Sequence, residues 1–321
     1  MSRPTQEERT RPTVSVVGAG RLGTALGRAM FLTGYRIQAL VSRRASHATA
    51  ARAVVGSASM VLTANQLHLL PPSKLILITT PDDGIAGTAQ KLALLQRGLV
   101  QGATVLHTSG ALSADVLAPL AEMGFHVGSL HPLLSVSDSR TGSENFSGTF
   151  FCLEGDRVAV RVARAIVRDL KGESFSISSH SKPLYHAAAV MASGHIVALI
   201  DLATTMLVRC GLSEAKARRV LLPLVQSTVR NLTTSDSAHA LTGTFARGDL
   251  ATVKRHLQAL SDAGLAAPLE SYKLLGRRSL ELAKDNGLDP HVLKQIKREL
   301  DLTASTPAAL RRSGPPAGRK K

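Results

Sequence analysis

The sequence predicts a two-domain protein of the α/β class, in which a doubly wound parallel sheet is followed by an all-helical second domain. Two observations predict this fold. Up to Ser178, short apolar or β-branched runs alternate with helix-like stretches, and after Ser178 long helical patterns follow one another. Alternating strands and helices build a parallel sheet with helices on its faces. The 321 residues, 44% of them hydrophobic, are enough for two such domains.

The first domain is expected over residues 13–179, after a disordered tail at residues 1–12. Runs typical of strands lie at residues 13–17, 36–41, 60–63, 74–80, 104–107 and 126–129, and two more lie at 149–153 and 173–177. Stretches typical of helices lie between strands at residues 23–33, 85–96, 114–123 and 157–170. In a doubly wound sheet of this kind, ligands bind beyond the carboxyl ends of the strands.

The second domain is expected over residues 180–301. Helical patterns run over residues 182–210, 213–229, 250–263, 268–286 and 291–300. Glycines and a proline stand where these patterns stop. The last segment, residues 302–321, is rich in Pro, Gly, Ala and basic residues, and is expected to be a disordered tail.

The segment VSVVGAGRLG carries a glycine pattern between a strand and a helix. In its GxGxxG spacing, Gly18 permits a tight turn, Gly20 lets a pyrophosphate approach the backbone, and Gly23 lets the helix pack on the strand. The alternative is an ordinary turn between a strand and a helix. The context favours a dinucleotide-binding Rossmann domain, because the first amides of the helix face the phosphates. The predicted cofactor-binding residues of this turn are Gly18, Ala19, Gly20, Arg21, Leu22 and Gly23.

The residues after the second strand distinguish the two nicotinamide dinucleotides. A free ribose 2′-hydroxyl usually meets an acid there, whereas a 2′-phosphate is bound by Arg. No acidic residue lies between Glu8 and Asp82, and the second strand leads into Ser42, Arg43 and Arg44. These side chains can hold a phosphate by charge-assisted hydrogen bonds, although a solvated loop is the alternative. We therefore predict NADP(H) as the cofactor.

Further candidate residues follow the later strands. Thr80 and Pro81 are expected to form the wall beside the nicotinamide. Ser109 and Gly110 precede a helix, so backbone amides there can hold a substrate carboxylate. Ser109 is also predicted to be a cofactor-binding residue. His131 stands before a proline near the end of the domain. A ligand contact and a structural hydrogen bond remain alternatives for this histidine.

The helix that begins with SKPLYHAAAVMASGH combines polar and apolar residues. Pro183 is typical of a first helical turn, so Lys182 stands at the positive end of the helix dipole, where its pKa is expected to be lowered. Helical spacing places Lys182, Tyr185, His186 and Ser193 on one face. We predict Lys182 and His186 as catalytic residues, and Tyr185 and Ser193 as substrate-binding residues. An exposed helix start with a hydrogen-bonded histidine is the alternative.

A second polar segment, ALTGTFARGD, lies in the helical half of the chain. Asp249 is expected to cap the helix that follows it, which gives this acid a structural role. Arg247 has no such role and is predicted to bind a substrate carboxylate in a bidentate manner. A solvated surface arginine is the alternative.

Composition restricts the remaining classes of function. Cys152 and Cys210 lack CxxC or Cys/His partners, so we expect reduced thiols and no metal site. No uninterrupted apolar run reaches the length of a membrane span, and the first residues lack an apolar signal, so a cytoplasmic protein without membrane contact is expected. The net charge of +16 includes five basic residues of the final tail. Nucleic acid is not expected as the main partner, because no aromatic residues accompany these charges.

Several motifs together resemble a known family. HTSGALSADVL, SLHPLLS, LYHAAAVMAS, LLPLVQSTVRNL and ALTGTFARGDLATVKRHLQAL are similar to Rossmann-like oxidoreductases with a C-terminal domain of unknown function. This family belongs to the 6-phosphogluconate-dehydrogenase-like superfamily, which includes ketopantoate and pyrroline-5-carboxylate reductases. The resemblance implies hydride transfer from NADPH, with Lys182 matching a catalytic lysine of relatives and His186 standing where they carry Asn. Gly194 and Thr244 depart from the family pattern, where Asn and Pro are expected.

The first hypothesis for function is an NADPH-dependent reductase of a small 2-oxo acid, such as ketopantoate. In this hypothesis Lys182 donates the proton, while Ser109, His131 and Arg247 position the substrate. The rival is a pyrroline-5-carboxylate or other cyclic imine reductase, whose substrate can arrive protonated and needs no lysine donor. A third hypothesis is a regulatory NADP-binding protein whose basic tail contacts nucleic acid. By analogy with relatives, a homodimer through the helical domain is expected.

Overall fold

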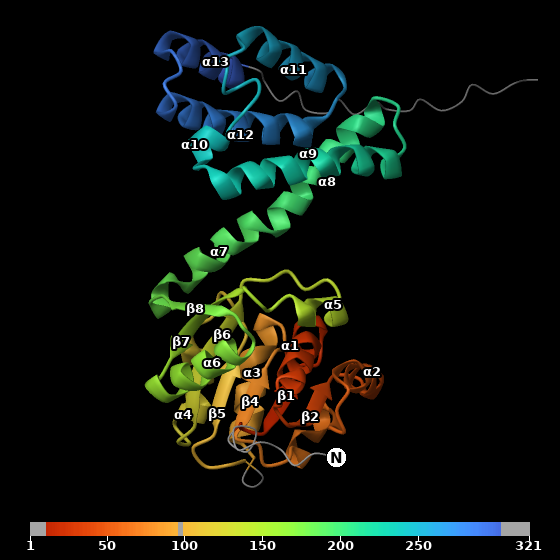
Figure 1. Ribbon diagram of the computed structural model, residues 1–321, viewed down its shortest axis with the longest axis vertical. Coiled ribbons are helices and arrows are strands. Elements are labelled where there is room, and N and C mark those ends of the chain that lie inside the picture. The colour runs from red at the N-terminus through yellow and green to blue at the C-terminus, as the bar shows by residue number, and fades with distance from the viewer. Residues whose placement is uncertain (1–10, 96–98, 303–321) are drawn as a thin grey trace, which may run out of the picture. The chain divides into compact units, whose positions relative to one another are not determined.

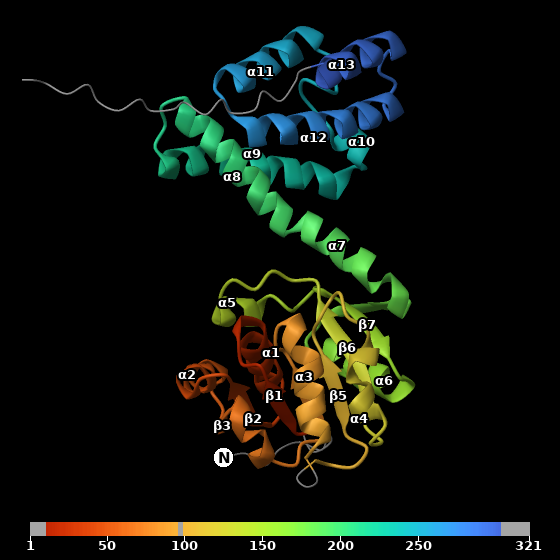
Figure 2. The same cartoon turned by 180° about the vertical axis from the view of Figure 1, so that it is seen from behind.

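The computed structural model describes residues 11–95 and 99–302. The chain divides into two compact units, the first ending at Ser193 and the second beginning at Gly194. Figures 1 and 2 show the first as a sheet covered by helices and the second as helices alone. The predicted tails, residues 1–12 and 302–321, lie almost entirely outside the described residues.

Among the described residues, eight strands of the first unit form one sheet in the order β3-β2-β1-β4-β5-β6-β7-β8. The order reverses beside β1, as in a doubly wound sheet, so the carboxyl ends of β1 and β4 are neighbours. The strands are β1 (Val14–Val17), β2 (Ile37–Ser42), β3 (Met60–Thr63), β4 (Leu75–Ile78), β5 (Thr104–His107), β6 (His126–Pro132), β7 (Phe150–Gly155) and β8 (Glu173–Ser176).

The sheet departs from the prediction at its last two strands. β7 pairs with β6 in the antiparallel direction, with Leu130 opposite Leu153, and β8 then pairs with β7 in parallel. β6 also continues three residues beyond the predicted end, because residues as far as Pro132 keep their pairing with β7. His131 is therefore a strand residue opposite Cys152, rather than part of a loop.

Two apolar cores lie on opposite faces of the sheet. Side chains alternate along a strand, so Leu75 and Leu77 enter one core while Ile76 and Ile78 enter the other. The helices of the first core are α1 (Arg21–Leu32), α2 (Ala45–Val55) and α6 (Arg157–Asp169), and α1 also packs against α5 (Ser139–Glu144). The second core contains η1 (Ala64–Leu69), α3 (Asp82–Ala93), η2 (Ala114–Leu117) and α4 (Ala118–Ala121).

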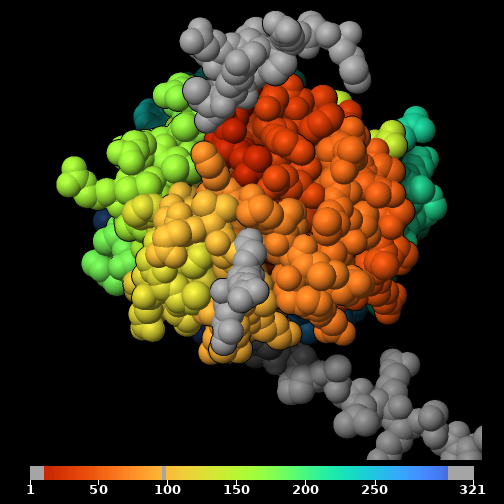
Figure 3. Space-filling model, turned by 90° about the horizontal axis from the view of Figure 1, so that it is seen from below, coloured from red at the N-terminus to blue at the C-terminus, as the bar shows by residue number. Residues whose placement is uncertain are grey.

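From β4 onward the strands follow one another across the sheet in the order of the sequence. Seen from below, orange segments lie between the red N-terminal segments and the yellow segments of the later strands (Figure 3). The helix α2 and the short segments η1 and α5 were not predicted. α3 begins at Asp82, and its N-cap residue is Pro81.

The long helix predicted at residues 182–210 is divided into two. The η3 turn (Ser179–Ser181) and α7 (Lys182–Ala192) belong to the first unit, and α8 (Gly194–Arg209) begins the second. Ser193 interrupts the helix with φ −128° and ψ −78°. Gly194, the first departure from the family pattern, follows it, and an added Cβ would meet nothing within 4 Å.

Residues Ser179–Arg209 together are long and apolar enough to span a membrane by length and composition alone. This stretch is not an uninterrupted apolar run, because it contains His195 and Asp201. One such helix among the described residues is only a weak indication of a membrane span.

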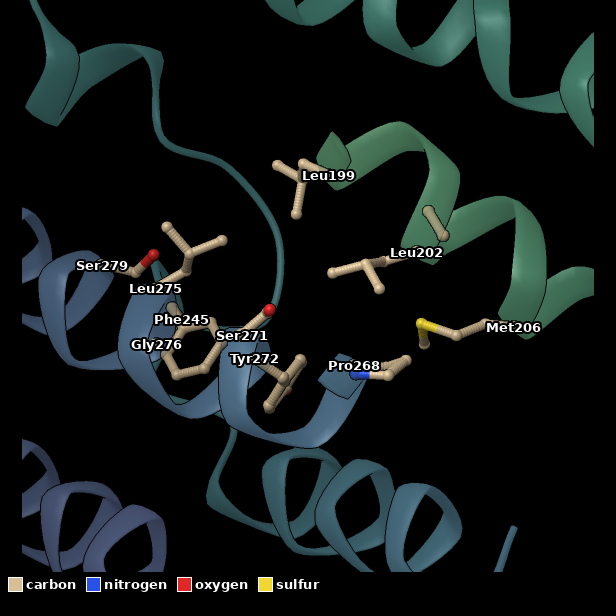
Figure 4. Close-up of a pocket in the computed structure, with 11 residues that line it drawn as sticks. Leu199, Leu202, Met206, Phe245, Pro268, Ser271, Tyr272, Leu275, Gly276 and Ser279 are labelled. Atoms are coloured by element: carbon tan, nitrogen blue, oxygen red, sulfur yellow. The ribbon is translucent and has the colours of Figure 1, made fainter. Parts of the chain in front are cut away.

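The second unit is helical throughout its described part. Its other helices are α9 (Glu214–Thr234), α10 (Ser237–Ala240), α11 (Leu250–Asp262), α12 (Ala266–Asp285) and α13 (Pro290–Leu302). As predicted, Asp249 caps α11, accepting a hydrogen bond from the Thr252 amide at 3.0 Å. Leucines and a methionine of α8 face Tyr272 and its neighbours on α12 across a small apolar pocket (Figure 4).

Candidate functional site

The glycine turn after β1 has the geometry that the sequence predicts. Gly18 has φ +115°, and an added Cβ would lie 2.5 Å from the Thr80 nitrogen. A Cβ on Gly23 would overlap the Thr79 hydroxyl and lie 2.5 Å from the Gly18 oxygen, so α1 packs closely on the turn. A Cβ on Gly20 would meet only the Gly18 oxygen, at 3.9 Å. The space above Gly20 is thus open, as the approach of a pyrophosphate requires.

A pocket extends from this turn along the carboxyl ends of β1, β2 and β4. It contains Gly18, Ala19 and Gly20 from the turn, and Thr80 and Pro81 beyond β4. Of the predicted turn residues, Arg21, Leu22 and Gly23 do not line it. The pocket residues are Val17, Gly18, Ala19, Gly20, Val41, Ser42, Arg43, His47, Ala64, Leu67, Thr79, Thr80, Pro81, Asp83, Gly84, Gly87, Thr88 and Lys91.

Two features of the pocket fit a dinucleotide. The Thr80 hydroxyl is buried and has no hydrogen-bond partner, so it is available to a ligand. The N-terminus of α1 carries no side-chain cap and no acid in its first turn. Its first amides are therefore left for an anion, as they are where a helix binds a pyrophosphate.

The two predicted arginines differ in whether they line the pocket. Ser42 and Arg43 line the pocket, whereas Arg44 lies outside its lining and is the N-cap residue of α2. Two further basic residues, His47 on α2 and Lys91 on α3, line it as well. These two residues were not predicted, because the cofactor-binding residues were predicted only at the ends of strands.

One face of α3 also forms a wall of the pocket. Gly84, Gly87, Thr88 and Lys91 follow the spacing of a single helix face, and all four line the pocket. A Cβ on Gly87 would meet nothing within 4 Å, so the pocket is open above it. This spacing is visible in the sequence and was the signal available for these residues.

A second group of polar residues lies at the carboxyl ends of β5 and β6. His107, the last residue of β5, is fully buried, with Nδ1 accepting from the Ser109 amide at 3.1 Å and Nε2 3.2 Å from the Ser113 carbonyl oxygen. Burial, with a smaller effect of the Lys182 charge, lowers the pKa of His107 to about 3. This histidine is therefore neutral and fixes the loop that follows β5, a structural role.

Ser109 is also held by its own loop. Its hydroxyl accepts hydrogen bonds from the amides of Ala111 at 3.1 Å and Leu112 at 3.0 Å. Ser109 is almost completely buried and does not line the cofactor pocket. The backbone at Ser109 and Gly110 is thus rigid, and the predicted contacts of Ser109 with substrate and cofactor remain predictions.

Lys182 occupies the interior of the first unit. Its side chain is fully buried, and Nζ donates to the Ser109 carbonyl oxygen at 3.1 Å and to the Ser129 hydroxyl. Burial lowers the pKa of Lys182, partly offset by the charge of Glu154. The direction agrees with the prediction, but burial is the largest cause, not the helix dipole. Through these two hydrogen bonds, Lys182 connects α7 to β6 and to the loop after β5.

The imidazoles of His131 and His186 converge on Gly110. A Cβ on Gly110 would lie 2.8 Å from His131 Nε2 and would overlap His186 Nδ1, so only glycine fits between the two rings. The rings are perpendicular, with centroids 5.6 Å apart. His186 Nδ1 is buried and has no hydrogen-bond partner. Such an atom is costly to bury unless a ligand or water completes it.

Tyr185 fixes the orientation of His131. Its hydroxyl lies 2.6 Å from His131 Nδ1 and also contacts Cys152. When Tyr185 donates to Nδ1, the proton of neutral His131 is on Nε2, the atom beside Gly110. Burial, followed by the charges of His186 and Lys182, lowers the pKa of His131 to about 4. Burial also raises the pKa of Tyr185. Tyr185, His131 and His186 therefore form one fixed group of polar side chains.

The remaining two predicted site residues are not part of this group. Ser193 is exposed at the end of α7, where its hydroxyl donates to the Ala189 carbonyl oxygen at 2.8 Å. Arg247 is exposed in the second unit, in the loop before α11. Thr244, the other departure from the family pattern, lies in the same loop, and its carbonyl oxygen accepts from the Asp249 amide. Among the described residues, no cluster of side chains is suited to a metal ion.

Two family models match the sequence. Residues 1–132 match a Rossmann-like domain, and residues 149–279 match a domain of unknown function, DUF2520. A search of curated proteins finds none that matches the chain.

Several solved structures are similar to the chain. A candidate NADP oxidoreductase from Bacteroides fragilis is 24% identical with a TM-score of 0.70, over 84% of this chain and 98% of that chain. A Streptomyces aurantiacus imine reductase is 18% identical with a TM-score of 0.54, over 89% and 98%. A 1-pyrroline-5-carboxylate reductase from Streptococcus pyogenes is 15% identical with a TM-score of 0.53, over 91% and 98%. At these identities the similarity shows a shared fold.

Proposed function

Because the chain joins a Rossmann-like domain to a DUF2520 domain, we propose that it is an NADPH-dependent reductase and that its acceptor is the C=N bond of a small cyclic imine. The cofactor half of the proposal is supported by the open glycine turn, the unpartnered Thr80 hydroxyl and Arg43 at the far end of the pocket. When bound, NADPH supplies the hydride that reduces the acceptor carbon.

The burial of Lys182 is the observation that favours an imine. Reduction of a carbonyl needs a proton for the alkoxide, and the sequence had assigned that proton to Lys182. Its amine is fully buried and already donates to the Ser109 carbonyl and the Ser129 hydroxyl. A protonated imine becomes an amine on hydride addition without further proton transfer, so it places no such demand on Lys182.

His131 and His186 are the groups proposed to contact the acceptor. The unpartnered Nδ1 of His186 can accept a hydrogen bond from the N–H of a protonated imine, and His131 Nε2 lies beside the same glycine. Similarity in fold to an imine reductase and a 1-pyrroline-5-carboxylate reductase agrees with this proposal without identifying the substrate.

A small 2-oxo acid is the second candidate acceptor. One observation favours it: His131 Nε2 carries a proton beside Gly110 when Tyr185 donates to Nδ1. That N–H could polarise a ketone oxygen and supply its proton, in the role first assigned to Lys182. The role of Arg247 in binding a substrate carboxylate stays a prediction, and ketopantoate is the first compound to test.

The test is NADPH oxidation, followed by loss of nicotinamide absorbance, with 1-pyrroline-5-carboxylate, other cyclic imines and a series of 2-oxo acids. We expect turnover with an imine, retained in Lys182→Met and reduced about 100-fold in His186→Ala. Turnover with 2-oxo acids alone would contradict the imine as acceptor and support a 2-oxo acid instead. NADPH binding without turnover on any compound would contradict both and favour the regulatory hypothesis, whose basic tail lies outside the described residues.

A homodimer formed by the second unit remains part of the proposal. Val220, Leu224 and Leu232 on α9 are at least half exposed, and exposed apolar rows of this kind are typical of protein interfaces. Light scattering should give twice the chain mass, and Leu224→Glu should reduce it to one chain. A single-chain mass for the wild-type protein at high concentration would contradict the dimer.

The cytoplasmic location also remains a proposal. Cys152 and Cys210 are both free thiols, as expected for a reducing compartment. Fractionation of cells that express the protein would test this location.

A further inference from the structure

Three basic residues from three different elements line the same pocket. Arg43 follows β2, His47 lies in the first turn of α2, and Lys91 lies in the last turn of α3. All three side chains are exposed to the pocket or to solvent. None of them forms an ion pair with a described residue. The charges of Arg43 and Lys91 are therefore not compensated by an ion pair within the described residues.

Other residues of the pocket lining suit a flat, apolar group. Ala64 and Leu67 of η1 form one part of the wall, and Gly84, Gly87 and Thr88 of α3 form another. Neither glycine has a side chain to occupy the space beside the helix. Among the described residues that line the pocket, Asp83 alone is acidic, and it lies in the first turn of α3, at the opposite end of that helix from Lys91.

From this arrangement we infer that Lys91 and His47, together with Arg43, bind the 2′-phosphate of the cofactor, and that Lys91 is a determinant of selectivity for NADPH over NADH. The inference rests on the proposed function, since it concerns the same cofactor. A monoester phosphate carries close to two negative charges near neutral pH, and cations from different elements can contact its separate oxygens. An adenosine group between η1 and α3 would place such a phosphate in the pocket that these three residues line.

The inference differs from the sequence prediction in one respect. The sequence assigned the 2′-phosphate to Ser42, Arg43 and Arg44, all from one loop, whereas the structure adds a lysine 48 positions further along the chain than Arg43. A single loop can change its conformation to release a phosphate. A lysine on α3, a helix packed against the sheet core, holds its position independently of that loop.

The experiment is a fluorescence titration of the full chain with NADPH and with NADH, for wild type, Lys91→Ala and His47→Ala. Arg52→Ala is the matched control, because Arg52 is an exposed cation on α2 that does not line the pocket. We expect Lys91→Ala to weaken NADPH binding about tenfold and His47→Ala about threefold, with NADH affinity unchanged. Arg52→Ala should change neither affinity.

Competition of NADPH with 2′-AMP, 5′-AMP and inorganic phosphate identifies which phosphate group of the cofactor Lys91 binds. If the inference is correct, Lys91→Ala weakens 2′-AMP and leaves 5′-AMP unchanged. Equal weakening of both nucleotides would place Lys91 near the pyrophosphate and overturn the inference. An unchanged ratio of NADPH to NADH affinity in Lys91→Ala would also overturn it.

The outcomes separate this inference from the proposed function. If wild type prefers NADPH and Lys91→Ala keeps that preference, the inference fails while the reductase proposal stands. If the Lys91→Ala result is as expected but no imine or 2-oxo acid is turned over, the reductase proposal fails while the phosphate site stands. If wild type binds neither nucleotide, both are wrong.

Discussion

The first unit contains two candidate functional regions that differ in how they are built. The pocket proposed for the cofactor is open, and its predicted anion-binding features come from a ten-residue glycine motif and exposed basic residues. The group around Gly110 is closed, and its members come from β5, β6, β7 and α7, which are far apart in the sequence. Burial changes the pKa values of His107, His131 and Lys182 in the second region. A region built from distant, buried groups depends on packing, whereas the pocket depends mainly on local backbone conformation.

The largest effect is expected at Gly110. In Gly110→Ala the new methyl group would overlap His186 Nδ1 and lie 2.8 Å from His131 Nε2, so one ring must move. We expect turnover to fall about 100-fold because the two imidazoles lose their alignment, and the free energy of unfolding to fall by about 1–3 kcal/mol. Steady-state kinetics and denaturant unfolding would measure both. Full activity in this variant would show that the two histidines do not act together.

Gly20 and Gly23 offer a matched pair within the glycine turn. An added methyl on Gly20 meets the protein only at 3.9 Å, whereas one on Gly23 overlaps Thr79 and the Gly18 carbonyl. Gly20→Ala should therefore change stability by less than about 1 kcal/mol but weaken NADPH binding at least about tenfold. Gly23→Ala should lower both stability and NADPH affinity. Calorimetric titration and thermal unfolding measure the two quantities, and unaltered NADPH affinity in Gly20→Ala would contradict the pyrophosphate position.

Acid should destabilise the buried region through its histidines. His107 and His131 have pKa values of about 3 and about 4 in the folded protein, below the value of about 6.5 for an unfolded histidine. Between those values the unfolded chain binds more protons, so stability is lost as the pH falls from about 6.5 toward 4. Two such histidines contribute a slope of up to roughly 2.7 kcal/mol per pH unit.

Urea unfolding at a series of pH values would measure that slope. His107→Asn should remove about half of it, because Asn has no proton to gain. His47→Asn is the control, since His47 is exposed and lies outside the buried region. A slope that is the same in wild type and His107→Asn would show that His107 is not buried in the neutral form.

The smallest of these effects is expected at Lys182. Lys182→Met keeps the approximate length of the side chain but removes the amine that donates to the Ser109 carbonyl and the Ser129 hydroxyl. The Ser129 hydroxyl still donates to the Ser109 carbonyl oxygen at 3.3 Å. Loss of these buried hydrogen bonds costs about 1–3 kcal/mol, and relief from burying an amine offsets part of it. We expect a net loss of about 1 kcal/mol by denaturant unfolding, with NADPH affinity unchanged. Loss of NADPH affinity would show that Lys182 acts on the cofactor pocket.

The sequence by itself determined the fold class, the glycine turn and the identity of most strands. These features depend on short-range patterns: the alternation of apolar residues, the spacing of Gly18, Gly20 and Gly23, and the absence of acids before Asp82. It also determined that Lys182 begins a helix, because Pro183 follows it. Each of these inferences needs only residues that are near one another in the chain.

The tertiary structure alone decided what surrounds those residues. Lys182 was predicted as a catalytic residue at the start of a helix, with an exposed helix start as the alternative. Packing against β6 buries it, and its amine donates to the Ser129 hydroxyl. Lys91 lines the cofactor pocket because α3 packs against the sheet in the second core. The helical spacing of Lys91 is visible in the sequence, but what that helix face meets is not. Burial and partner choice depend on groups far apart in the sequence, and those groups meet only when the sheet forms.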